Sequence, residues 1–213
     1  MQIEIKDTPI ELLSEKAIFI PGTKTLVIAD LHLGKASHFR KHGISIPMES
    51  AEKDYLRLKQ LIDQVRPPRV LLLGDLFHSE HNNEWKWFCD FVNGYKEVEF
   101  ILVMGNHDIL DKKHYKEVCL TLVDEELIES ELIFSHKPMK KVPEGKFNLA
   151  GHLHPGYKVR GKGRQSILLP CFYKTIDQMI LPAFGSLTGL ALMNDKGKKS
   201  EVYVIANDKV IKM

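Results

Sequence analysis

The sequence predicts an α/β fold in which two mixed sheets pack together and helices lie outside them. In the first half of this 213-residue chain, apolar runs of strand length alternate with amphipathic stretches, which is typical of a parallel sheet covered by helices. The second half consists mainly of short strand-like runs, which we expect to form or extend a second sheet. No repeat or long linker interrupts the pattern, so we expect a single domain over residues 1–213.

The first half begins with three short predicted strands, at residues 3–5, 17–20 and 26–29. A helix is expected over residues 48–65, because its apolar residues recur at alternating steps of four and three and form one stripe. Proline residues directly after residue 66 end this helix, since proline cannot continue its hydrogen bonding. The stripe consists of Ala51, Tyr55, Leu58, Ile62 and Val65.

Two further apolar runs, at residues 69–75 and 99–108, predict buried strands, with a helix between them over residues 83–93. The aromatic residues of this helix suit a covered core position; the alternative is an exposed aromatic patch for a partner or a nucleic-acid base. In the second half, short strands are expected around residues 120–123, 132–135, 147–150, 157–160, 166–169, 178–181 and 201–205.

Composition excludes several classes of protein. Hydrophobic residues make up 44% of the chain and charged residues 27%, and no apolar run approaches the roughly 20 residues of a membrane helix. The N-terminal residues lack the pattern of a signal peptide, so we expect a cytoplasmic protein. The three cysteines are scattered along the chain, which indicates reduced thiols rather than zinc ligands or a disulfide framework.

Charge is distributed unevenly along the chain. Residues 1–136 carry 16 Lys and Arg against 23 Asp and Glu, a net charge of −7, whereas residues 137–213 carry 14 against 5, a net charge of +9. Basic residues gather at 137–141 and 158–164. Such a segment is either a solvated surface or a basic wall beside a site that handles polyanions.

Polar residues of the types that bind metals follow each strong strand. The carboxyl ends of strands in an α/β sheet meet at one edge, which is the usual location of a site. Residues two apart in an extended segment point the same way, so Asp30 with His32, and His152 with His154, can face one cavity. The full set is Asp30, His32, Asp75, His78, Asn106, His107, Asp108, His136, His152 and His154.

Each of these residues alone has an ordinary explanation, such as a hydrogen-bonded core histidine, a turn or a helix cap. Together they would bury many polar groups, which is costly without a partner, and a metal ion supplies that partner. Nitrogen and oxygen ligands without thiolates suit Mn²⁺, Fe²⁺ or Zn²⁺ in a reactive site. Seven ligands from this set of ten residues would already be too many for one tetrahedral ion. The sequence therefore indicates two divalent ions sharing a carboxylate, a centre that can hydrolyse phosphate esters.

In their order and spacing, the motifs ADLHLG, GDLFH, GNHD, SHKP and GHLH resemble those of the calcineurin-like metallophosphoesterases. The resemblance implies a four-layer α/β/β/α sandwich of two mixed sheets flanked by helices. It implies a first metal bound by Asp30, His32, Asp75 and His154. It implies a second metal bound by Asp75, Asn106, His136 and His152, so that Asp75 is the bridge.

The same resemblance implies that His107 faces the substrate, where it stabilises the transition state or protonates the leaving oxygen. Asp108 would orient it, and an imidazole oriented by a carboxylate is a suitable general acid. The GDLFH motif is also similar to that of the double-strand-break repair nucleases, in which the final histidine takes part in catalysis. His78 either inherits that role or is structural.

A narrower resemblance, to the ligase-associated DNA damage response endonucleases, is carried by VIADLHLGKASHFRKHGISIP and, late in the chain, by LLPCF and LPAFGSLTG. It implies DNA as the substrate and association with an ATP-dependent DNA ligase, a DEXH-box helicase and an exonuclease. Lys35, Arg40 and Lys41 follow the first metal motif and either contact phosphates or form a solvated helix face.

The leading hypothesis is therefore a metal-dependent phosphodiesterase that cleaves nucleic acid, in particular DNA, during repair. We expect two divalent ions, with Mn²⁺ favoured over Fe²⁺ and Zn²⁺. One alternative is a phosphodiesterase or phosphatase for small substrates such as cyclic nucleotides. A third hypothesis is a non-catalytic module that binds the ligase or helicase. The sequence leaves the native metal and the choice between endonuclease and exonuclease action open.

Overall fold

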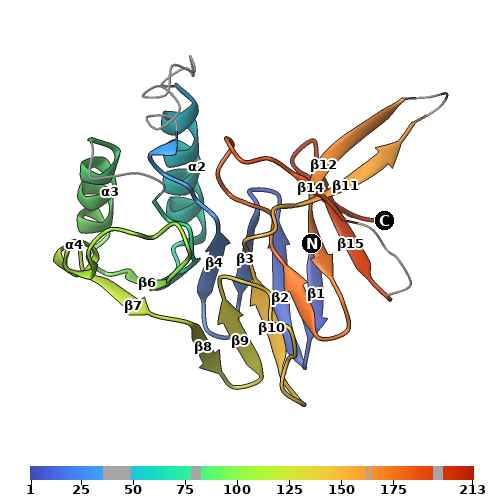
Figure 1. Ribbon diagram of the computed structural model, residues 1–213, viewed down its shortest axis with the longest axis horizontal. Coiled ribbons are helices and arrows are strands. Elements are labelled where there is room, and N and C mark those ends of the chain that lie inside the picture. The colour runs from blue at the N-terminus through green and yellow to red at the C-terminus, as the bar shows by residue number, and fades with distance from the viewer. Residues whose placement is uncertain (36–48, 78–82, 162, 164, 194–198) are drawn as a thin grey trace.

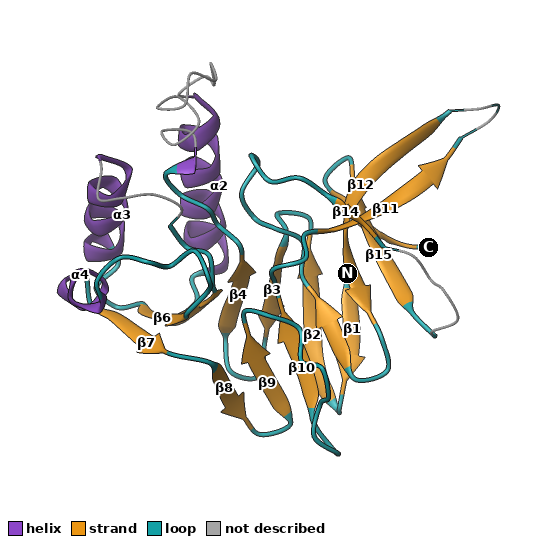
Figure 2. Cartoon of the chain, in the orientation of Figure 1, coloured by secondary structure: helices purple, strands orange, loops and turns teal. Residues whose placement is uncertain are grey.

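The computed structural model describes residues 1–35, 49–77, 83–161, 163, 165–193 and 199–213. Within these residues the chain forms two mixed β-sheets, of seven and nine strands, with three helices beside them (Figures 1 and 2). The predicted α/β class with two mixed sheets flanked by helices is confirmed. None of the described helices is long and apolar enough to cross a membrane.

The first sheet has the strand order β1-β2-β3-β4-β5-β6-β7. Its first four strands form an antiparallel meander, and β4 to β7 run parallel to one another. The carboxyl ends of these parallel strands therefore meet at one edge. The strands are β1 (Gln2–Ile5), β2 (Thr8–Leu13), β3 (Ala17–Ile20), β4 (Thr25–Ala29), β5 (Arg69–Leu73), β6 (Glu99–Val103) and β7 (Leu120–Val123).

Helices α2 (Glu49–Val65), α3 (Asn83–Gly94) and α4 (Lys112–Glu117) pack against one face of this sheet. Alternate residues of the central strands supply that face, for example Leu26 and Ile28 of β4, and they contact the apolar stripes of the helices. The aromatic residues of α3 are core residues, as one of the two interpretations of this helix expects, except that Trp87 is 39% exposed.

The other face of the first sheet packs against the second sheet. Val27 and Ala29 of β4 point into a core that also contains Phe134, Leu149 and Phe172 from the second sheet. The two sheets therefore share one buried apolar layer, in which side chains from both sides interdigitate.

The second sheet places two parallel strands, β9 and β10, next to each other, so that their carboxyl ends also lie together. Its main strand order is β14-β11-β12-β13-β10-β9-β8, and β15 pairs with β12 and β16. On the face turned away from the first sheet lies a small apolar cluster, to which none of the described helices contributes. The strands are β8 (Glu126–Glu129), β9 (Leu132–Ser135), β10 (Phe147–Ala150), β11 (Pro155–Arg160), β12 (Ser166–Lys174), β13 (Gln178–Ile180), β14 (Ala191–Leu192), β15 (Glu201–Ala206) and β16 (Lys209–Lys212).

Some elements were not expected from the sequence. Strands β2 and β16 follow two-residue turns, Lys6-Asp7 and Asn207-Asp208, in which both residues have positive φ. Such turns suit a hairpin, but neither pair is the Asn-Gly or Asp-Gly that signals one. β8, β14 and α4 are short and also carry little periodic signal. The runs expected as strands at 69–75 and 99–108 end earlier, at Leu73 and Val103, so their polar residues lie in loops.

The shared core predicts a large destabilisation when one of its aromatic side chains is removed. Phe134 is 1% exposed between the sheets, so Phe134→Ala should lower the free energy of unfolding by about 3–5 kcal/mol. Ile176 is 85% exposed, and Ile176→Ala should change it by less than about 0.5 kcal/mol. Denaturant unfolding of both variants checks this; equal stabilities would contradict the two-sheet core.

Candidate metal centre

The candidate ligands follow the carboxyl ends of parallel strands in both sheets, which bring them to one edge of the molecule. Asp30 follows β4, Asp75 follows β5 and Asn106 follows β6. From the second sheet, His136 follows β9, and His152 and His154 follow β10. The described ligating atoms form two groups, Asp30 with His32 and His154, and Asp75 with His136 and His152.

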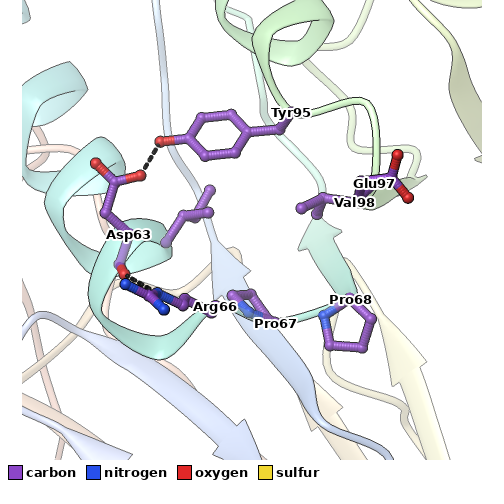
Figure 3. A pocket seen from close by; sticks show the side chains of 8 residues that line it. Asp63, Arg66, Pro67, Pro68, Tyr95, Glu97 and Val98 are labelled. Atoms are coloured by element: carbon purple, nitrogen blue, oxygen red, sulfur yellow. Dashed lines mark hydrogen bonds between the residues drawn. The ribbon is translucent and has the colours of Figure 1, made fainter.

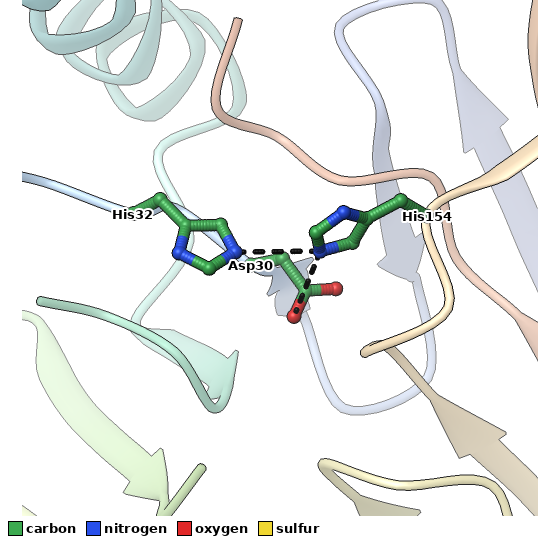
Figure 4. A group of neighbouring side chains, drawn as sticks. All are labelled: Asp30, His32 and His154. Atoms are coloured by element: carbon green, nitrogen blue, oxygen red, sulfur yellow. Dashed lines mark hydrogen bonds and ion pairs between the residues drawn. The ribbon is translucent and has the colours of Figure 1, made fainter. Parts of the chain in front are cut away.

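In the first group, the side chains of Asp30, His32 and His154 point toward one another (Figure 4). The Nε2 atoms of the two histidines are 3.3 Å apart, and His154 Nε2 is 3.7 Å from Asp30 Oδ1. Asp30 is only 1% exposed. These three residues can therefore bind one cation from three sides.

In the second group, His136 Nε2 is 3.0 Å from His152 Nδ1 and 3.4 Å from Asp75 Oδ1. Asn106 belongs to the same group, because its Oδ1 is 3.1 Å from His136 Nε2. Two imidazole nitrogens, a carboxylate oxygen and an amide oxygen thus converge, a mixed nitrogen and oxygen set that suits a divalent transition metal.

Asp75 lies between the two groups. Its Oδ1 faces His136, while its Oδ2 is 3.8 Å from His32 Nε2 in the first group. The residues predicted for each ion are therefore together, and Asp75 reaches both sets.

The histidine rings are held so that one nitrogen is available to a cation. His136 Nδ1 lies 3.1 Å from the carbonyl oxygen of Leu73, to which it can donate, and this leaves the Nε2 lone pair facing the group. Burial lowers the pKa of His152, and the nearby His136 and Lys137 lower it further. Both effects favour the neutral imidazole, which is the form that binds metals.

The residues fit divalent cations. Asp30 Oδ1 is buried and accepts no hydrogen bond from the described residues, although an unpaired buried carboxylate oxygen is costly. Two pairs of imidazole nitrogens approach to 3.3 and 3.0 Å, a distance that needs a proton or a cation between the lone pairs. A cation in each group would satisfy all of these atoms.

The backbone of the ligand loops is strained. Asp30, His32, Asp75, His152 and His154 all have positive φ, between 48° and 70°. This conformation costs of order 1–3 kcal/mol per residue and is typical of functional sites. We expected Asp30 and His32 to point the same way because they lie two apart in an extended segment. That reason was wrong, because both residues have left-handed backbone conformations, and these turns direct the side chains.

Glycines let the ligand loops approach one another closely. A Cβ atom at Gly105 would collide with the backbone nitrogen and the carboxylate of Asp75. A Cβ atom at Gly151 would collide with the carboxylate of Asp30. The glycines of the GNHD and GHLH motifs therefore supply space rather than ligands.

His107 lies at the exposed side of the centre. Its ring centroid is 5.9 Å from that of His32, and its backbone N–H donates to Asp75 Oδ1 at 2.9 Å. The side chain is exposed, as a group that meets a substrate must be. The structure thus brings His107 next to the ligands, and its catalytic role stays a prediction.

Asp108 is buried, and its hydrogen bonds with described residues go to backbone amides. Its Oδ1 accepts from Leu76 and Phe77 at 2.8 and 3.2 Å, and its Oδ2 accepts from Gly105 at 2.8 Å. Burial raises the pKa of Asp108 to about 6, and these amides oppose the rise. Asp108 therefore joins the loops after β5 and β6, while its predicted orientation of His107 stays untested.

Of the residues predicted to contact phosphates, Lys35 lies near the centre. Lys35 lines a small hollow together with His32. Burial lowers the pKa of Lys35, and the carboxylates of Asp75 and Asp30 oppose this fall. His78, Arg40 and Lys41 lie outside the described residues.

Sequence reasoning missed two buried acids that support the centre. Glu84 of α3 accepts a hydrogen bond from Gly34 N at 2.7 Å, which fixes the turn after the first metal motif. Asp54 of α2 accepts from the backbone and hydroxyl groups of Ser186, whose neighbour Gly185 donates to Asp30 O. Both acids lie on amphipathic helices, where an acidic residue carries no distinguishing signal.

Two hollows help to locate the site. One of about 460 Å³, lined by Tyr95 and Pro68 among others, lies at the amino ends of β5 and β6, the edge opposite the ligands (Figure 3). It holds a hydrogen bond from Tyr95 to Asp63 and contains none of the candidate ligands. The other, of about 360 Å³, adjoins the ligands Asn106 and His136.

Comparison with known proteins agrees with this geometry. The family model described as calcineurin-like phosphoesterase matches residues 23–175, and the chain belongs to that family. It is therefore a metallophosphoesterase, a hydrolase with a centre for divalent metals. No curated protein matches the sequence.

Among solved structures, the crystal structure of Pseudomonas putida nuclease MPE superposes with a TM-score of 0.84 at 26% identity. The match covers 100% of this chain and 99% of that one. The Aquifex aeolicus protein of unknown function AQ665 matches 66% of this chain and 82% of that one, with a TM-score of 0.45 and 21% identity. The resemblance seen in the sequence is thus confirmed at the level of the family, with a nuclease as a full-length structural relative.

The close approach at Gly105 predicts that a single methyl group disrupts the centre. Gly105→Ala must displace Asp75, and a shift of about 1 Å in a catalytic group costs about 10²-fold in rate. Gly22→Ala is the matched control, because a Cβ atom there meets nothing within 4 Å. Bound metal and hydrolysis of bis-p-nitrophenyl phosphate should fall in the first variant alone. If Gly105→Ala kept wild-type metal content and activity, the loops that carry Gly105 and Asp75 would not need to approach this closely.

Proposed function

We propose that this protein hydrolyses phosphodiester bonds in nucleic acid, with DNA as its substrate in repair, and that two Mn²⁺ ions serve the reaction. The observation that carries the proposal is Asp75, whose two oxygens face two separate groups of ligands. The full-length structural likeness to a nuclease supports nucleic acid as the substrate, and so does the net charge of +9 in residues 137–213.

The ligand sets follow from the two groups. Asp30, His32 and His154 would bind one ion, and His136, His152 and Asn106 the other, with Asp75 shared. Two such ions, when bound, polarise a phosphoryl oxygen and lower the pKa of water to supply a nucleophile near neutral pH. The nitrogen and oxygen donors leave Fe²⁺ and Zn²⁺ as alternatives to Mn²⁺.

The protein's own groups position the reacting phosphate. The exposed imidazole of His107 is anchored through its backbone to Asp75, so a phosphodiester bound beside Asp75 meets this ring. His107 would donate a proton to the leaving oxygen, and Lys35, which lines a hollow with His32, would attract the phosphate. The carboxyl group of Asp108 keeps the two loops in register through its backbone hydrogen bonds.

The exposed edge argues against the small-substrate alternative. Asn106 and His107 are both exposed in the described part of the chain, and Asn106 lines a hollow that also includes the exposed residues of the turn between β7 and β8. An open centre suits a polymer that extends beyond the site better than it suits a cyclic nucleotide. Association with a DNA ligase, a helicase and an exonuclease remains part of the same proposal.

A substrate panel with added Mn²⁺ tests the function. Single-stranded and nicked DNA should be cut, and a chelator should abolish cleavage. Asp75→Asn should lower the rate by about 10³-fold or more, because metal ions contribute several kcal/mol of transition-state stabilisation. Asp7→Asn, in an exposed turn, should match the wild type. Cleavage of cyclic nucleotides but not of DNA would contradict the proposal, and a metal-free inactive protein would favour a binding module.

The leaving group tests the role of His107. A general acid matters when the leaving group is a poorly stabilised alkoxide, so His107→Asn should slow DNA cleavage by about 10²–10⁴-fold. Hydrolysis of bis-p-nitrophenyl phosphate should fall much less, because p-nitrophenolate leaves without a proton. Bound metal should be unchanged, and His114→Asn on α4 serves as the control. An equal loss with both substrates would assign His107 to charge stabilisation instead.

A further inference from the structure

A two-stranded arm begins directly at the metal centre. β11 starts at Pro155, the residue after His154, and pairs antiparallel with β12 from Gly156 opposite Pro170 to Arg160 opposite Ser166. Figure 1 shows this hairpin extending away from the two sheets. Its base is buried and paired with β14 through Pro155 and Gly156. The arm therefore has a fixed position relative to the ligands.

The two faces of the arm differ. Tyr157, Val159 and Leu169 share one face and pack against the apolar cluster of the second sheet. Lys158 and Arg160 alternate with them and are exposed. The apolar face holds the arm in place but leaves Tyr157 and Val159 half-buried, with part of each side chain lining the hollow at the edge of β11. The other face presents two cations.

The outer edge of β11 adjoins a hollow of ligand size. β14 pairs with β11 only at Pro155 and Gly156, so within the described residues the edge beyond Gly156 is unpaired. A hollow of about 460 Å³ lies there, within the 300–1,000 Å³ typical of ligand sites. It combines an apolar floor with two cations, and its lining includes Tyr157, Lys158, Val159, Arg160, Leu192 and Met193.

The charges of the arm are available to a polyanion. Neither Lys158 nor Arg160 forms an ion pair with any described residue. Residues 145–176, which include the arm, contain six Lys and Arg and no Asp or Glu. Lys174, at the base of β12, pairs with Glu201, so the positive potential of the described arm rests on Lys158 and Arg160.

The hollow beside the second group of ligands is less favourable to a polyanion than the arm is. The hollow beside Asn106 and His136 is lined by the exposed acids Asp124, Glu125 and Glu126, at the turn between β7 and β8, and also by Lys137. Asp124 forms an ion pair with Lys112, so Glu125 and Glu126 carry the remaining negative charge of this turn. A phosphate backbone bound at the centre would meet mixed charge in that direction and only positive charge along the described part of the arm. The charge distribution therefore favours one path for the strand.

We propose that the β11–β12 arm is a second nucleic-acid site, which binds the single strand leaving the metal centre; this rests on the proposed nuclease function. Phosphates contact Lys158 and Arg160, and unpaired bases lie against the apolar floor that includes Tyr157, as on other single-strand platforms. Arg160 lies six residues beyond His154, roughly 20 Å at about 3.3 Å per residue. That distance corresponds to roughly six stacked nucleotides at about 3.4 Å each.

The length dependence of cleavage tests the arm. For wild type, kcat/KM on oligothymidylates should rise with length until roughly six nucleotides extend past the cut, and then level off. Lys158→Glu/Arg160→Glu should remove this rise and lower kcat/KM on long strands by about tenfold or more. Hydrolysis of bis-p-nitrophenyl phosphate, which is too small to reach the arm, should stay within about twofold.

Charge and base contacts are separated by two further measurements. The first measurement is binding by fluorescence anisotropy, with Asp75→Asn present to prevent cleavage. Adding Lys158→Glu/Arg160→Glu should flatten the slope of log Kd against log salt concentration by about 1.4, because each of the two lost phosphate contacts contributes about 0.7. Strands with abasic positions over the arm should bind more weakly than oligothymidylate of equal length. Lys24→Glu/Lys96→Glu is the matched control, since both lysines are exposed at the opposite edge.

The outcomes distinguish the arm from the nuclease function itself. If wild type hydrolyses bis-p-nitrophenyl phosphate but cuts no nucleic acid, the proposed function fails. If wild type cuts strands with a length dependence that Lys158→Glu/Arg160→Glu leaves unchanged, the function stands and the arm proposal is overturned. The unpaired edge of β11 would then be available to pair with an extended peptide strand instead.

Discussion

The structure depends on two buried carboxylates, Asp30 and Asp75, that accept hydrogen bonds from the protein and also face the candidate cation sites. Asp30 Oδ2 accepts the backbone N–H of His152 at 2.7 Å and so joins the first sheet to the second, while its Oδ1 is left to a cation. Asp75 Oδ1 accepts the backbone N–H of His107 and also faces His136. Buried charges of this kind are tolerated only with a partner of opposite sign. The metal centre is therefore also the junction at which the two sheets are fastened.

The surrounding packing serves this junction. The apolar layer between the sheets brings the carboxyl ends of their parallel strands to one edge, and the helices cover the opposite face of the first sheet. The strained ligand loops are then held by acids that accept backbone amides, Asp108 for the loops after β5 and β6 and Glu84 for the turn at Gly34. Strain persists where such contacts over-determine it.

The surroundings of the centre are electrostatically asymmetric. An acidic turn lies beside the second group of ligands, and a basic arm starts at the last ligand of the first group. The acids and bases segregate along the sequence too, with the excess of acids before residue 137 and the excess of bases after it. Folding places part of each excess beside the site, the acids of the turn between β7 and β8 in one direction and the basic arm in another, and this arrangement can orient a polyanion as well as attract it.

The sequence by itself predicted most strands of the core, the two long helices and the candidate ligand residues. These depend on local patterns: apolar runs of strand length, a helical stripe, and polar residues where a strand ends. Only the tertiary structure decided how the loops meet, because His152 contacts Asp30 across 122 positions and no local pattern encodes such a contact. The left-handed backbone at Asp30 and Asp75 and the amide contacts of Asp108 have the same origin. These backbone conformations and contacts arise where loops from separate strands pack closely against one another.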